Sequence, residues 1–232
     1  MAGMTFATGG FESVLEYLTG EILGGRVPPG SRLPNERELA TQLGASRSAV
    51  REALKVLQAQ GVVTSHTGPA GGTRVATGQG PAFGRMMRLH VALDAISFAE
   101  LTETRVVLER ATVEAAPAQA TEADLTALDS LVDDMSGLMD VTEFNELDTS
   151  FHLLLARLGA NRLIRDLTVA IREAVAAPIL EAERRVTDWD RLRERLNAEH
   201  RAIVSALWAQ DGGLAADLVE RHIRDAHATL LP

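Results

Sequence analysis

The sequence contains no cysteine, which excludes disulfide bonds and thiolate chemistry and leaves the redox compartment open. No segment approaches the roughly 18 unbroken apolar residues of a membrane-spanning helix. Residues 1–10 have neither the basic start nor the apolar run of a signal peptide. We therefore expect a cytoplasmic protein. Apolar residues still make up 46% of the 232 residues, enough for a buried core in one large domain or two small ones.

Basic residues are fewer than acidic ones, but the shortage is confined to one part of the chain. Residues 1–78 hold seven bases and six acids, whereas residues 79–232 hold sixteen bases and twenty-six acids. A near-neutral head with clustered arginines on an acidic body is compatible with DNA binding by the head. Residues 66–81 are dense in glycine and proline, which indicates turns or a linker. We therefore predict two domains, a head of residues 1–78 and a body of residues 79–232.

The head has the pattern of three helices followed by a hairpin. Apolar residues at helical spacing predict helices that begin near Phe11, after the N-cap residue Asn35 and after the N-cap residue Ser46. The segments VVTSH (62–66) and TRVAT (73–77) then predict two short strands around a glycine-rich loop. This order is the layout of a winged helix-turn-helix.

Polar residues gather at the outward N-terminal end of the third helix: Ser46, Arg47, Ser48 and Arg51. Recognition helices place their base-reading residues at this end, which enters the major groove first. An arginine can bond guanine O6 and N7 together, while serine hydroxyls and backbone N–H groups hold phosphates. The alternative is an ordinary solvated helix start.

A family resemblance favours DNA recognition. The segment PPGSRLPNERELATQLGASRSAVREALKVLQAQGVV, with GGTRV downstream, resembles the winged-helix domain of GntR-family bacterial transcription regulators over residues 11–76. The resemblance implies DNA contacts by the arginine of the ERE segment, the first turns of the recognition helix and the wing tip. In this sequence these are Arg37, Ser46, Arg47, Ser48, Arg51, and His66 to Gly68.

The body is predicted to be almost entirely helical, with a short helix at 82–95 followed by longer ones. Capping residues and apolar periodicity place the longer helices at about 97–118, 121–139, 142–158, 161–186, 189–209 and 212–230. Pro178 should kink or interrupt the helix at 161–186. The expected fold class is therefore mainly α, with a winged helix-turn-helix joined to an antiparallel bundle of six or seven helices.

Four polar residues of the body lie where apolar residues belong. Asp148 and His152 are four residues apart beside the apolar face of their helix, while His200 and His222 each fill a missing step in an apolar stripe. Each histidine could be a satisfied core residue, since burying such groups singly is costly but tolerable when they are hydrogen-bonded. Convergence on one cation would satisfy all four together. Three imidazoles and one carboxylate suit zinc, nickel or another divalent transition metal.

A second resemblance agrees with this metal site. The segment NELDTSFHLLLARLGAN, with EHRAIVSAL and ERHI downstream, is similar to the ligand-binding domain of the FadR-like branch of the GntR regulators. Metal-containing members of that branch use an aspartate and three histidines, which fall here on Asp148, His152, His200 and His222. The resemblance also makes Arg105 a candidate partner for an organic acid, although a surface ion pair with Glu109 is nearly as plausible. Because the acyl-CoA-sensing member lacks this metal set, we do not expect a fatty acyl-CoA effector.

The leading hypothesis for function is a metabolite-responsive transcription regulator. It would bind a palindromic operator as a homodimer and act as a repressor that a small hydroxy-, keto- or sugar acid releases. The alternatives are a metal-dependent hydrolase, in which three histidines and an aspartate hold an activated water, and a regulator that senses the metal itself. No additional general base is evident near the ligands, and a hydrolase leaves the DNA-reading head unexplained, so we expect no enzyme activity.

Overall fold

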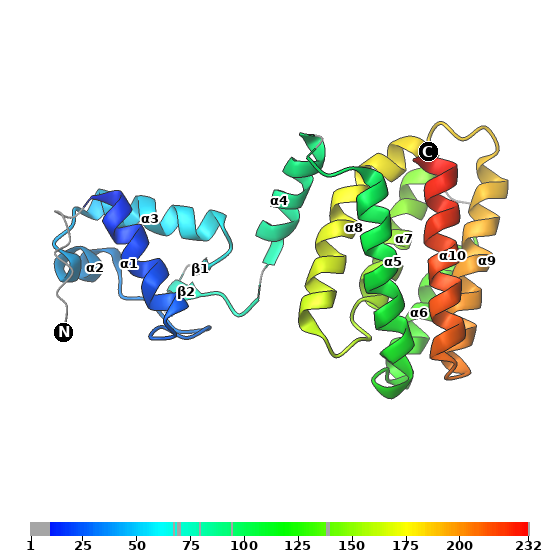
Figure 1. The fold of residues 1–232 in the computed structure, drawn as a ribbon, viewed down its shortest axis with the longest axis horizontal. Helices are drawn as coiled ribbons and strands as arrows, with labels where there is room; N and C mark the ends of the chain where they lie inside the picture. Colours follow the sequence, from blue (N-terminus) through cyan, green and yellow to red (C-terminus); the bar gives the residue numbers. More distant parts are fainter. Residues whose placement is uncertain are drawn as a thin grey trace. The chain divides into compact units, whose positions relative to one another are not determined.

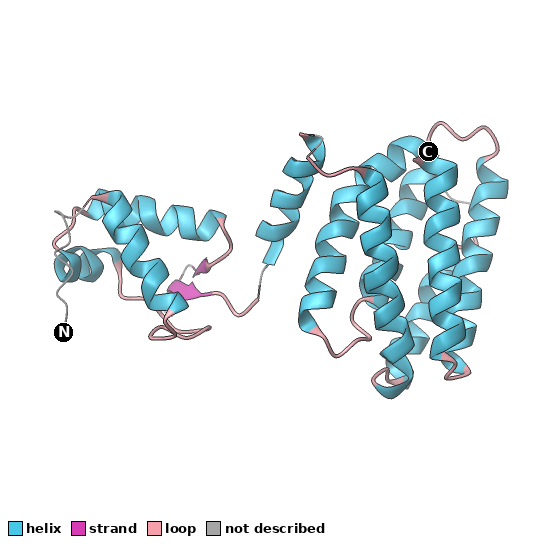
Figure 2. Ribbon diagram, viewed as in Figure 1, coloured by secondary structure: helices cyan, strands magenta, loops and turns pink. Residues whose placement is uncertain are grey.

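The computed structural model describes residues 10–66, 68, 71–78, 80–93, 95–137 and 140–231. Within these residues the chain is mostly helical, and its strands form a single hairpin, drawn in magenta in Figure 2. Contacts divide the chain into two compact units, Met1–Phe83 and Gly84–Pro232. The expected mainly α fold is confirmed. Whether DNA binding and effector binding divide between residues 78 and 79 stays a prediction.

The first unit contains three helices, and side-chain caps fix the starts of the second and the third. The helices are α1 (Phe11–Leu23), α2 (Glu36–Leu43) and α3 (Arg47–Ala59). Asn35 accepts hydrogen bonds from the N–H groups of Arg37 and Glu38, and Ser46 accepts one from the N–H of Ala49, as their N-cap positions predict. Helices α1 and α2 both pack against α3. The apolar side of α3 is therefore buried and its polar side is left to solvent.

The hairpin of the first unit pairs β1 (Val63–His66) with β2 (Gly72–Val75) in antiparallel register, with Val63 opposite Val75. Both of these valines are buried, so the base of the hairpin is anchored in the core of the unit. The connection between the strands needs left-handed backbone, and Gly68 and Gly72 supply it with φ values of 103° and 129°. This hairpin is the wing of the predicted winged helix-turn-helix.

The second unit is a helical bundle. Its elements are α4 (Gly80–Ala92), which belongs to this unit from Gly84 on, α5 (Phe98–Ala115), the 3-10 turn η1 (Ala116–Ala118), α6 (Glu122–Asp134), α7 (Val141–Leu155), α8 (Arg162–Glu183), α9 (Trp189–Trp208) and α10 (Gly212–Leu230). Helix α5 packs against α8 and α10, α9 packs against α6 and α10, and α7 packs against α6 and α8 (Figure 1). These contacts enclose one apolar core. Among the described residues, no helix is both long and apolar enough to cross a membrane.

Most predicted helix starts of the body match the structure, while several ends fall earlier. Ser97 with Glu100 and Thr121 with Asp124 form the expected capping boxes. Helix α7 ends at Leu155 rather than near residue 158. Of the two outcomes predicted at Pro178, a kink or an interruption, the interruption is wrong, because α8 continues through this residue to Glu183. The kink stays a prediction. Buried residues on both sides of the proline hold the helix against its neighbours, which offsets the lost backbone hydrogen bond.

Candidate functional site

The four polar residues singled out on the body helices come together in the interior of the bundle. Asp148 and His152 lie on α7, His200 on α9 and His222 on α10. All four are buried, the most exposed being Asp148 at 6%. One donor atom from each lies within 4.8 Å of the others, so this set could hold a metal ion. Helical periodicity placed each side chain inward, and the packing of α7, α9 and α10 brings them to one point.

The donor atoms that face one another are one carboxylate oxygen and three Nε2 atoms. Oδ1 of Asp148 lies 3.2 Å from Nε2 of His200 and 3.7 Å from Nε2 of His152. Nε2 of His222 lies 3.2 Å from Nε2 of His200 and 3.3 Å from that of His152. Neighbouring ligands of one ion at about 2.1 Å lie roughly 3.0–3.4 Å apart. The donor set and its spacing therefore fit a single transition-metal ion.

Two glutamates determine which ring nitrogen of two histidines carries the proton. Glu109 of α5 lies 2.7 Å from Nδ1 of His152, and Glu199 of α9 lies 2.8 Å from Nδ1 of His222. An ionised carboxylate only accepts hydrogen bonds, so each Nδ1 is the protonated nitrogen and donates. The two Nε2 lone pairs then face each other at 3.3 Å. Such an arrangement is repulsive without a cation between the rings, and it is the usual outer-shell geometry of metal-bound histidines.

Burial and neighbouring charges shift the pKa values of the groups in and around the cluster. Burial, reinforced by neighbouring positive groups, lowers the pKa of His200 and His222 well below the usual value, so both rings are neutral at physiological pH. Burial alone would raise the pKa of Glu109, but its interaction with His152, which includes a hydrogen bond, and the positive charge of Arg105 lower it below its ordinary range. Burial raises the pKa of Glu199. Neutral imidazoles are the form that binds metal.

Two arginines and a third glutamate complete the polar interior. Arg105 donates from Nε to Glu109 at 3.1 Å, so the ion pair considered for the surface exists but is buried, with side chains 8% and 1% exposed. Arg172 of α8 pairs with Oδ2 of Asp148, which leaves Oδ1 of Asp148 directed at the histidines. Burial lowers the pKa of Arg172 to about 9. Glu183, also on α8, accepts a hydrogen bond from Asn145, and burial raises its pKa to about 7.

A narrow cavity opens on one side of the cluster. Asp148, His152 and His222 line it together with Arg105, Arg172 and Glu183, and aliphatic side chains of α8, α9 and α10 close it. The Nε of Arg172 has no hydrogen-bond partner within the described part of the chain. The cavity is thus lined both by three of the possible metal ligands and by Arg172, whose Nε could donate a hydrogen bond to a bound small molecule.

Sequence reasoning missed three of these residues as parts of the site. It considered Glu109 only as a partner of Arg105, and it did not single out Glu199 or Arg172. The signal for Arg172 was present, because it lies four residues after Thr168 and three before Val175 on the buried side of α8. It is the same kind of anomaly as the histidines, a charged group on an apolar face.

The seven residues predicted to contact DNA are all described, and the structure places them in the first unit. Arg37 lies on α2, four residues lie at the start of α3, and two lie in the hairpin. All seven are exposed: Arg37, Ser46, Arg47, Ser48, Arg51, His66 and Gly68. Thr67, inside the predicted wing contact, lies outside the described residues. Arg51 of α3 forms an ion pair with Glu36 of α2 at 2.8 Å, so this contact joins the two helices.

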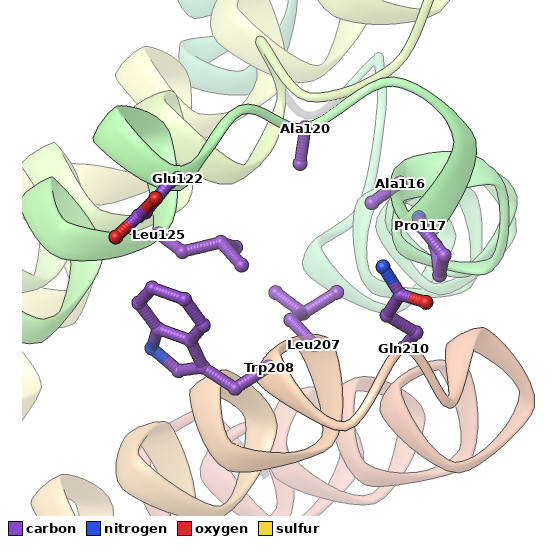
Figure 3. A pocket seen from close by; sticks show the side chains of 8 residues that line it. All are labelled: Ala116, Pro117, Ala120, Glu122, Leu125, Leu207, Trp208 and Gln210. Atoms are coloured by element: carbon purple, nitrogen blue, oxygen red, sulfur yellow. The ribbon is translucent and has the colours of Figure 1, made fainter.

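A separate pocket of about 180 Å³ lies at the junction of η1, α6 and the end of α9. Figure 3 shows the Trp208 indole on one side and the Gln210 carboxamide on the other, with Leu125 and Leu207 between them. Nε1 of Trp208 donates to Asp129 at 2.6 Å. The pocket shares no residue with the polar cluster, so it is not part of the candidate metal site.

A winged helix-turn-helix unit joined to a helical unit with a buried polar site defines a class of protein, the two-domain transcription regulators. Comparison with known proteins gives the family. The model "Bacterial regulatory proteins, gntR family" matches residues 11–75 and the model "FCD domain" matches residues 100–225. The chain therefore belongs to the GntR family of bacterial regulators, in its FadR-like branch with an FCD domain.

Individual relatives agree with this family. The HTH-type transcriptional regulator LutR of Bacillus subtilis (strain 168) is 28% identical over 90% of this chain and 95% of its own length. An Escherichia coli (strain K12) protein, named provisionally as an L-lactate dehydrogenase operon regulatory protein, is 27% identical over 87% of this chain and 78% of its own. The solved structure of Streptococcus agalactiae GntR superposes with a TM-score of 0.64 over 94% of this chain and 99% of that one, at 24% identity. The matched family models describe bacterial regulatory proteins, so the chain is a DNA-binding transcription regulator of this family.

Proposed function

We propose that this protein is a repressor that binds a palindromic operator as a homodimer and is released by a small organic acid, which it senses through a divalent metal in the second unit. The single observation that carries the sensing site is the pair of facing Nε2 atoms of His152 and His222, each oriented by a carboxylate on its Nδ1. Zinc is the expected ion and nickel also suits the ligands Asp148, His152, His200 and His222.

The operator contact is assigned to the first unit. Arg47 begins α3 with its side chain exposed and is proposed to read base edges in the major groove. Arg37 and Arg51 are proposed to hold phosphates, with the hydroxyls of Ser46 and Ser48 beside them. His66 and Gly68 place the wing against the neighbouring backbone. A dimer would present two such heads to the two halves of an operator, because operator symmetry mirrors protein symmetry.

An anionic effector is supported by the charges that line the cavity. Arg105 and Arg172 both face it, and the Nε of Arg172 is unpartnered among the described residues. When bound, a divalent ion supplies a Lewis-acidic position for one carboxylate oxygen. Arg105 orients the acid by a charge-assisted hydrogen bond, and the apolar walls exclude water from the contact. The name of the E. coli relative refers to an L-lactate dehydrogenase operon, and lactate is an acid of this kind.

Metal analysis of purified protein tests the sensing site. Wild-type protein should contain about one equivalent of metal, and His152→Ala should contain none. His90→Ala is the matched control, because His90 is exposed on α4 outside the cluster. Chelation should lower the melting temperature of wild type and of the His90 variant, and restored zinc or nickel should raise it, because an ion bound only to folded protein stabilises it by mass action. Wild-type protein that holds no metal and takes up none would refute the proposal.

A regulator that senses the metal itself is the second candidate, favoured by the same buried cluster. Titration of operator binding separates the two. If acid alone changes the affinity of metal-loaded protein, the metal is a resident cofactor. If operator affinity follows free metal without acid, the metal is the signal.

A further inference from the structure

The tip of the wing carries neither lysine nor arginine. From Val62 to Thr73 the sequence holds no such residue, and His66 is the one residue of this stretch with a basic side chain. Contacts to DNA phosphates depend mainly on the charges of lysine and arginine. A wing that lies against the DNA backbone would therefore have to obtain its positive charge from another segment.

The segment just before α2 lies along β2 and brings an arginine to the wing. The backbone N–H of Leu33 donates to the carbonyl of Thr73 at 2.8 Å, and Arg32 forms an antiparallel bridge with Arg74 of β2. Leu33 is buried, so this segment is anchored in the core of the first unit. The backbone of Arg32 is therefore held in place beside the hairpin.

The guanidinium group of Arg32 lies over Gly72, at the tip end of β2. A Cβ atom added to Gly72 would come within 2.9 Å of Nε and 3.3 Å of Cζ of Arg32, so a larger residue there would displace the group. Gly72 is the partner of His66 in the hairpin register. Because opposite residues of an antiparallel pair share a face of the sheet, the Arg32 charge lies on the same face as the His66 side chain.

Arg32 is exposed, and among the residues that the structure describes its side chain has no hydrogen-bond or ion-pair partner. Other bases of the same unit are already paired with carboxylates: Arg26, Arg51 and Lys55. We propose that Arg32 is a further DNA-contacting residue, which binds a backbone phosphate beside the wing and supplies the charge that the wing tip lacks. This inference rests on the proposed contact between the wing and DNA and adds a residue to it.

The salt dependence of binding to a duplex of mixed sequence tests this contact in the full-length protein, because a phosphate contact does not require the operator. Each phosphate contact contributes about 0.9 to the slope of log affinity against log salt concentration. Arg32→Gln should therefore reduce the slope by about 0.9 for each head on the duplex. Between about 50 and 200 mM salt, the loss of affinity should then be about 3.5-fold smaller per head.

Two further variants separate the charge of Arg32 from its structural role. Arg32→Lys keeps the charge and should keep the wild-type slope. Arg26→Gln is the matched control, because it removes the same charge from the same unit, in the loop after α1, where Arg26 is paired with Glu21. Its slope should equal that of the wild type. Thermal unfolding followed by circular dichroism checks that each variant is folded.

The outcomes distinguish this inference from the proposed function when Arg37→Gln, at a proposed phosphate contact, is measured on the same duplex. If Arg37→Gln reduces the slope and Arg32→Gln does not, only the inference is overturned. If neither reduces it, the proposed DNA-binding face is wrong and the inference fails with it. A slope reduced as much in Arg26→Gln or in Arg32→Lys as in Arg32→Gln would also overturn the inference, because the loss would then not report a charge at this position.

Discussion

Replacement of Glu109 by glutamine tests how the candidate metal site is oriented. In the wild type the Glu109 carboxylate lies 2.7 Å from Nδ1 of His152 and also accepts from Arg105. A glutamine keeps the shape but loses the charge, and its amide group can rotate to direct N–H at the ring. The lone pair on Nε2 is then less basic and no longer fixed by its partner.

The expected loss is about 10- to 100-fold in metal affinity, which corresponds to about 1.4–2.7 kcal/mol. The same change leaves Arg105 without its buried partner, so the metal-free variant should also be less stable. Competition with a chelator of known zinc affinity measures the first effect, and thermal unfolding of metal-free protein measures the second.

Glu114→Gln provides the control, because Glu114 lies on the same helix and is exposed. The two variants remove the same charge, so a difference between them reports the local contact rather than the net charge of the protein. If Glu109→Gln holds zinc as tightly as Glu114→Gln, Glu109 does not orient a metal ligand and the reasoning about the facing Nε2 atoms is refuted.

Three further perturbations follow from the structure. Arg47→Ala should weaken specific operator binding by about 1–3 kcal/mol at fixed salt with the fold intact; the exposed Arg26→Ala is its control, and equal affinities would exclude base reading by Arg47. Arg51→Ala should weaken all DNA sequences alike and reduce the salt slope by about one; a loss confined to the operator would contradict a phosphate contact. Burial raises the pKa of Glu183 to about 7 from an ordinary value near 4.5, so its charge destabilises the fold increasingly between these two pH values and fully above the upper one. Glu183→Gln should therefore raise the free energy of unfolding at pH 8 by up to about 3 kcal/mol, seen as a higher melting temperature, with no gain near pH 4. A gain in stability that does not depend on pH would exclude this cause.

The sequence predicted the local structure better than the convergence of side chains. Asn35, Ser46 and Ser97 act as N-caps because a cap depends on residues three positions away. The interruption expected as one alternative at Pro178 does not occur, and this error has the opposite origin: the buried side of the helix is held by residues from other helices, which local propensity does not register.

The same limit applies to the candidate site. Periodicity placed Asp148, His152, His200 and His222 on inward faces, but it could not say that their donor atoms meet. It could still less assign Glu199 to the Nδ1 of His222, since that contact spans α9 and α10. Outer-shell partners depend on how helices are rotated against each other, and that rotation is decided by the packing of the whole core.

The absence of cysteine gives the buried cluster a further consequence, in the topology of the chain. A protein without disulfides has no covalent cross-link to shorten the loops of its unfolded state. Ligation of one ion by Asp148 of α7 and His222 of α10 would cross-link these residues and close the chain between them into a loop. His200 of α9 would be a further ligand within that loop. On the chain-entropy scale used for disulfides, a loop of this length is worth about 4 kcal/mol. Unlike a disulfide, such a metal cross-link would open and close with metal supply and pH and not with redox potential, so it would be reversible under conditions in which no oxidant is present.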